Sequence, residues 1–107
     1  MRLHLPFAGD RRTNQFGPGL YAYTQDSDHE RAKIHLRIDQ DGTGLLLINA
    51  NRAIHLNSTA ARMAWLTLED LPEPLSIREI RKSFKVSANQ ARRDFSAIQT
   101  QINELIK

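Results

Sequence analysis

The sequence predicts an α+β fold of the winged-helix kind, in which a three- to four-stranded antiparallel sheet is followed by a three-helix bundle. Three observations predict it. Apolar and polar residues alternate over residues 34–38, as in a strand with one buried face. An apolar run at 45–48 follows Asp41-Gly42, a pair that suits a tight hairpin turn. Beyond residue 57 the apolar residues recur every three or four positions, which is the period of an amphipathic helix.

Size and composition indicate one small domain. The chain has 107 residues, 40% of them hydrophobic, which is enough for a single core. It contains no cysteine, so disulfides and metal sites made of its own thiolates are excluded. No apolar run is long enough for a signal peptide or a membrane span, and we expect a cytoplasmic protein. The net charge of +3 favours nucleic acid or an acidic peptide as a partner and requires neither.

The chain is expected to divide into an N-terminal arm, residues 1–32, and a winged-helix domain, residues 33–107. Within the arm, residues 20–24 have the aromatic and β-branched bias of a strand and are expected to add an edge strand to the sheet. The polar stretch 25–30 is expected to be a loop.

The last strand of the predicted sheet covers residues 53–56 and follows the turn Asn49-Ala50-Asn51. No segment of the sequence is an obvious partner for its far side. We therefore expect a free strand edge there.

Three helices are expected after this strand. Asn57 is a good N-cap for the first, and the prolines after Leu71 end it. Ser76 and Ser87 each begin a capping box, the signature of a helix N-terminus, and are expected to start the second and third helices. The third helix carries one apolar stripe over four turns: Ala91, Phe95, Ile98, Ile102 and Leu105.

No residue pattern indicates catalysis. His4, His29, His35 and His55 lack the spacing of a metal site, and no glycine-rich loop for phosphate is present. The carboxylates are scattered and fit strand and helix ends. We expect a protein that is not an enzyme, with no catalytic residues, no cofactor and no metal.

A basic cluster lies between residues 76 and 93, where Glu79 is the single acid. Its members are Arg78, Arg81, Lys82, Lys85, Arg92 and Arg93. In a helix-turn-helix protein the second helix inserts its N-terminal side chains into the major groove, and here these would be Ser87, Asn89, Gln90 and Arg93. A winged helix-turn-helix DNA-binding protein is therefore one alternative, and a solvated charged face explains the cluster equally well.

Several segments carry a resemblance to a known family. Leu56-Asn57 precedes Thr59-Ala60-Ala61, and after a proline break come Ile77-Arg78-Glu79-Ile80 and a long helix that follows Val86-Ser87. In this order the chain resembles the PqqD-like family over residues 33–106. Its members are RiPP recognition elements, domains that bind the leader of a ribosomally synthesised precursor peptide and present it to a modifying enzyme.

The resemblance implies a non-catalytic peptide chaperone whose partners are a precursor peptide and a radical SAM enzyme. The leader would add as a strand to the free edge formed by Arg52, Ala53, Ile54, His55 and Leu56, with the Ile54 amide available at that edge. Gln90, Arg93 and Asp94 of the third helix would form the wall of the groove. The other alternative is a second copy of the chain, paired through the same edge in a homodimer.

Overall fold

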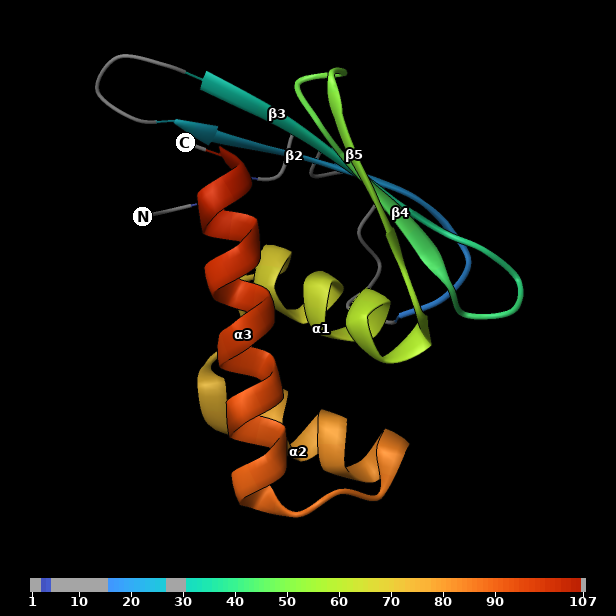
Figure 1. The fold of residues 1–107 in the computed structure, drawn as a ribbon, viewed down its shortest axis with the longest axis vertical. Coiled ribbons are helices and arrows are strands. Elements are labelled where there is room, and N and C mark those ends of the chain that lie inside the picture. Colours follow the sequence, from blue (N-terminus) through green and yellow to red (C-terminus); the bar gives the residue numbers. More distant parts are fainter. Residues whose placement is uncertain (1–2, 5–15, 27–30, 107) are drawn as a thin grey trace.

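The computed structural model describes residues 3–4, 16–26 and 31–106. A four-stranded antiparallel sheet comes first, and the two-residue β1 extends it beside β2. The strands are β1 (Leu3–His4), β2 (Gly19–Asp26), β3 (Arg31–Ile38), β4 (Gly44–Ile48) and β5 (Arg52–Leu56), and the helices are α1 (Ser58–Leu68), α2 (Glu73–Phe84) and α3 (Ala88–Ile106). The predicted α+β, winged-helix-like fold is confirmed (Figure 1).

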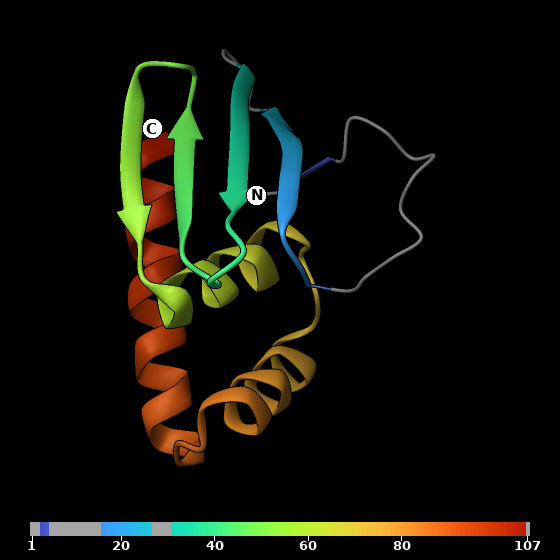
Figure 2. The same ribbon diagram turned by 90° about the vertical axis from the view of Figure 1, so that its right-hand side faces the viewer.

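The strands follow one another across the sheet in chain order, from β1 to β5. Figures 1 and 2 show α1 crossing below the sheet and α2 lying farther from it. The long α3 spans both levels, so that its C-terminal half lies beside the sheet and its N-terminal half beside α2. As a result, the C-terminal half of α3 lies nearer to β5 than its N-terminal half does.

The alternation in β3 produces the buried face of the sheet. Ile34, Leu36 and Ile38 are buried, whereas Lys33 and Arg37 on the other face are exposed. The core lies between this face and the helices, which contribute side chains such as Leu66 and Phe95.

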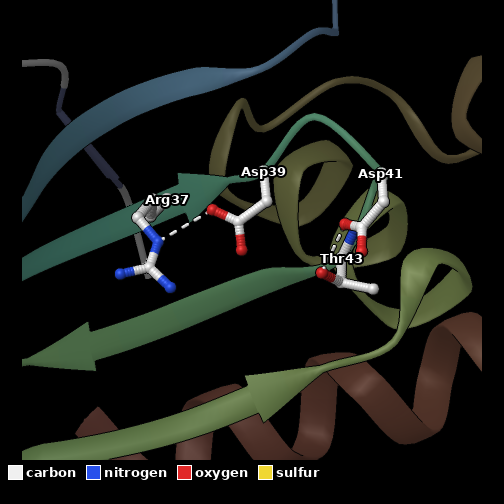
Figure 3. Close-up of polar contacts among 4 residues, drawn as sticks. All are labelled: Arg37, Asp39, Asp41 and Thr43. Carbon is white, nitrogen blue, oxygen red and sulfur yellow. Dashed lines mark hydrogen bonds and ion pairs between the residues drawn. The ribbon is translucent and has the colours of Figure 1, made fainter.

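The turn between β3 and β4 differs from the tight hairpin that was predicted. Gly42 has a φ of 91°, but Asp41 does not take a positive φ. Instead the Asp41 carboxylate accepts hydrogen bonds from the Thr43 hydroxyl at 2.6 Å and from the Thr43 backbone N–H at 3.0 Å (Figure 3). These bonds stabilise the charged form and lower the pKa of Asp41. The result is a longer loop closed by a side chain, with Arg37 and Asp39 paired beside it at 3.0 Å.

The predicted strand at residues 20–24 is longer than expected and is an integral part of the sheet. All eight residues of β2 pair with β3, and the expected boundary between residues 32 and 33 falls inside β3. Of the predicted loop at 25–30, Gln25 and Asp26 belong to β2, while residues 27–30 lie outside the described residues, as do residues 5–15 of the expected arm.

Two of the three predicted helix starts are confirmed. Asn57 Oδ1 accepts from the Ala60 N–H at 2.8 Å, and Ser87 Oγ accepts from the Gln90 N–H at 3.1 Å. The capping box at Ser76 is wrong, because α2 begins earlier, at Glu73, and Ser76 is fully buried within it. Proline in the first turn of a helix has no hydrogen bond to lose, so Pro74 does not delay the start.

Candidate functional site: a free strand edge beside α3

The last strand of the sheet, β5, has one unpaired edge. The strand order ends at β5, and in the described part of the chain no strand pairs with its outer side. Ala53 and His55 are exposed, Ile54 is half-buried and Leu56 is buried. An unpaired strand edge presents backbone donors and acceptors that another chain can use.

The hydrogen bonds beside β4 show which of its backbone groups face β5. The Asp39 N–H donates to the Thr43 carbonyl, and the Asn49 N–H donates to the Lys33 carbonyl, each at 2.8 Å. These two pairs continue the register in which β3 and β4 are paired. Hydrogen-bonded pairs alternate along an antiparallel ladder. The odd-numbered residues of β4 therefore face β3, and its even-numbered residues face β5. In agreement, the carbonyl of Ile48 accepts from the N–H of Asn51 at 3.2 Å.

The register between β4 and β5 shows which backbone groups of β5 face β4 and which face the free edge. The even-numbered residues of β4 pair with Arg52, Ile54 and Leu56 of β5, so the backbone groups of these three face the sheet. The N–H and C=O groups of Ala53 and His55 then point outward. The expectation that Ile54 offers its amide at the edge is wrong, because that amide faces β4.

The side chain of Ile54 contributes to the site in another way. Ile54 pairs with Leu46, which is 1% exposed, and paired residues share one face of a sheet. Ile54 therefore lies on the helix side of the sheet, where it packs half-buried against the core.

The C-terminal half of α3 lies next to this edge. Arg52 Nη1 donates to the Leu105 carbonyl at 2.7 Å, which ties the start of β5 to the last turn of α3. Gln99 and Asn103 lie on the flank of α3 that faces α1 and β2. Ile98 and Leu105 are on the other side of the buried stripe, toward β5, and are half-buried. Both belong to the predicted apolar stripe and pack against the core. The stripe alone does not predict that they are only half-buried, because this depends on how α3 lies against the sheet.

The other predicted wall residues cluster at the N-terminal end of α3. Gln90 Nε2 donates to Asp94 Oδ1 at 2.7 Å, and Arg93 Nη2 donates to Gln90 Oε1 at 2.7 Å. This end of α3 lies beside α2 and away from β5 (Figures 1 and 2). The structure thus brings the predicted residues of β5 together with α3, but with its C-terminal half and not with Gln90, Arg93 and Asp94.

The basic cluster forms an exposed surface on α2 and the first turns of α3. All six of its members are exposed: Arg78, Arg81, Lys82, Lys85, Arg92 and Arg93. Glu79 pairs with Arg62 of α1 at 3.3 Å, so the acid within this segment is engaged elsewhere. The surface is electropositive and separate from the β5 edge.

Comparisons with known proteins give no relative for this fold or site. No protein-family model, curated protein or solved structure matches the chain. Within the ranges 3–4, 16–26 and 31–106, no three His, Cys, Asp or Glu side chains are grouped so that they could hold a metal ion. The helices of these same ranges include none with the length and apolarity to cross a membrane.

Proposed function

We propose that this protein is a non-catalytic peptide-binding domain that adds an extended peptide to β5 as a further strand. The observation that carries the proposal is the pair of outward-facing residues, Ala53 and His55, at an unpaired edge beside the apolar flank of α3. Strand addition of this kind obtains affinity from main-chain hydrogen bonds and specificity from alternate side chains.

The geometry defines what the peptide must offer. Two outward residues provide two donors and two acceptors, and four such bonds contribute about 2–6 kcal/mol in total. The peptide residue opposite Ile54 directs its side chain toward Ile98 and Leu105, so an apolar residue is favoured there. Burying that side chain adds about 1.5–3 kcal/mol. After the cost of association, we expect micromolar rather than nanomolar affinity.

The resemblance to the PqqD-like family supports one particular ligand, the leader of a ribosomally synthesised precursor peptide. The same resemblance supports a radical SAM peptide-modifying enzyme as the partner to which the peptide is presented. The open edge of β5 is the feature of this chain that such a role requires.

The experiment is isothermal titration with the leader of a short precursor peptide encoded beside the gene. Wild type, Ala53→Pro and Ala53→Val are compared, because valine keeps the outward amide that proline removes. With proline at this position, one carbonyl of the bound leader peptide has no N–H partner. The Ala53→Pro variant should therefore bind the leader at least about tenfold more weakly than wild type, whereas Ala53→Val should bind it as wild type does. Absence of binding to the folded wild type, or equal binding by the two variants, would reject strand addition at β5.

A second candidate function, DNA binding, is favoured by the exposed basic surface on α2 and α3. If this surface binds DNA, affinity for a duplex will fall steeply with salt, because each phosphate contact releases a counterion. Arg92→Ala and Arg93→Ala would reduce that slope, whereas Ala53→Pro would leave it unchanged. Duplex affinity that is undetectable at low salt removes this alternative.

A further inference from the structure

A cavity lies on the flank of α3 that faces away from β5. Its volume is about 240 Å³, and it is partly open to solvent and lined by residues of β2, of the end of α1 and its following turn, and of the C-terminal half of α3. Five polar residues and two isoleucines line it, the polar ones being Gln25, Thr67, Asp70, Gln99 and Asn103. Asp70 and Asn103 are exposed at its rim, whereas Gln25 is buried in its wall.

One polar group in this wall has no partner. Gln25 is 4% exposed, and its Oε1 accepts no hydrogen bond from the described residues. A buried carbonyl oxygen without a donor destabilises the fold, and a bound donor would remove that cost. The terminal torsion of glutamine is soft, so the Gln25 amide can turn toward a ligand at little cost.

The remaining wall groups favour a donor as well. The Thr67 hydroxyl donates to the Met63 carbonyl at 2.9 Å, which leaves its oxygen as an acceptor. Asp70 is the single charged residue of the lining and forms no ion pair with the described residues. A hollow lined by one carboxylate together with amide and hydroxyl groups is suited to a cation that carries several N–H donors. Among the described residues no three His, Cys, Asp or Glu side chains are grouped to hold a metal ion, and this lining contains one carboxylate, so an organic cation fits it better than a metal ion.

We propose that this cavity binds a guanidinium group, either of a small organic cation or of an arginine side chain in a partner. The planar guanidinium carries five N–H donors and is more weakly hydrated than an ammonium, so it loses less when it enters a partly enclosed site. The cavity, at about 240 Å³, is many times larger than the space that one water needs, so a guanidinium with a short alkyl chain has room in it. The proposal does not depend on peptide binding at β5, because the two sites lie on opposite flanks of α3.

The test is a titration of the full-length, ¹⁵N-labelled protein followed by amide chemical shifts. The probe is n-butylguanidinium, with n-butylurea as a neutral molecule of similar shape. We expect saturable shifts for residues 67–70 and 99–103 with n-butylguanidinium, at an affinity on the order of millimolar for so small a ligand. N-acetyl-arginine methylamide distinguishes the two sources, since tighter binding than n-butylguanidinium indicates an arginine side chain.

The matched variants are Asp70→Asn and Glu73→Gln. Asp70 has a φ of 57°, a conformation that asparagine tolerates, so Asp70→Asn should keep the fold. It should weaken n-butylguanidinium binding about two- to fivefold, because Asp70 is exposed and solvent screens the ion pair that is lost. Glu73→Gln removes an exposed carboxylate outside the lining and should leave n-butylguanidinium binding unchanged. Equal shifts with n-butylurea, unchanged binding by Asp70→Asn, or the absence of shifts at these residues would overturn the proposal.

Discussion

Proline substitutions at two adjacent positions of β5 separate the inward backbone groups from the outward ones without any ligand. In Ile54→Pro the lost N–H belongs to the ladder with Leu46, which is 1% exposed, so the Leu46 carbonyl can recover no bond from water. In Ala53→Pro the lost N–H faces solvent, and proline is tolerated at such positions of an edge strand.

The two costs differ by a measurable amount. An unpaired buried carbonyl costs about 1–3 kcal/mol, and the partial loss of the Ile54 side chain adds about 1 kcal/mol. Ile54→Pro should therefore destabilise the protein by about 2–4 kcal/mol. Ala53→Pro should cost about 1 kcal/mol or less, since it removes no protein–protein hydrogen bond.

Urea denaturation followed by far-UV circular dichroism measures both free energies of unfolding. In a thermal melt of a domain of this size, a destabilisation of about 2–4 kcal/mol would lower Tm by about 8–32 °C. Ile54→Val is the control for the side chain alone, and about 0.5–1.5 kcal/mol is expected. Equal destabilisation by the two prolines, or a greater effect of Ala53→Pro, would refute the assignment of outward groups to Ala53 and His55.

Three further predictions concern the fold around the site. Phe95 is 2% exposed in the core, so Phe95→Ala should lower the free energy of unfolding by about 3–5 kcal/mol in urea, and a loss below about 1 kcal/mol would contradict its core position. The Thr43 hydroxyl lowers the pKa of the Asp41 carboxyl group in the folded state. The Asp41 carboxylate therefore stabilises the fold at pH values above its pKa in the unfolded chain, and this stabilisation is lost as the pH falls through its pKa in the folded protein. Asp41→Asn should therefore flatten the acid side of the Tm–pH curve, and an unchanged curve would oppose this interpretation. Arg52→Ala removes the hydrogen bond to the Leu105 carbonyl and should speed amide exchange in the last turn of α3. Because Arg52 is exposed, the free energy of unfolding should fall by about 1 kcal/mol or less. Unchanged exchange would show that this contact does not hold β5 to α3.

Local patterns were sufficient to predict most of the fold. The alternation at Ile34, Leu36 and Ile38 reports directly which face of β3 is buried. The N-caps at Asn57 and Ser87 are short-range hydrogen bonds that depend on a few consecutive residues. These features can be predicted from the sequence because residues that are neighbours along the chain determine them.

The site was harder to predict because it depends on geometry between elements. Whether Ile54 or Ala53 presents its amide at the edge depends on the register set by the preceding turns, where Asn49 and Ala50 both take a positive φ. The distance of Gln90 and Asp94 from β5 follows from where α3 crosses the sheet. A periodic apolar stripe shows that α3 packs against the core but does not show which half of it lies beside the sheet.

The most direct test of strand addition is amide hydrogen exchange of the ¹⁵N-labelled protein with and without the leader peptide. In the free protein, we expect fast exchange at Ala53 and His55 and slow exchange at Ile54, whose N–H is in the ladder. With saturating peptide, exchange at Ala53 and His55 should slow by at least about tenfold, because both amides become hydrogen-bonded. Protection that appears only on α2 and the start of α3, with Ala53 and His55 unchanged, would contradict strand addition at β5.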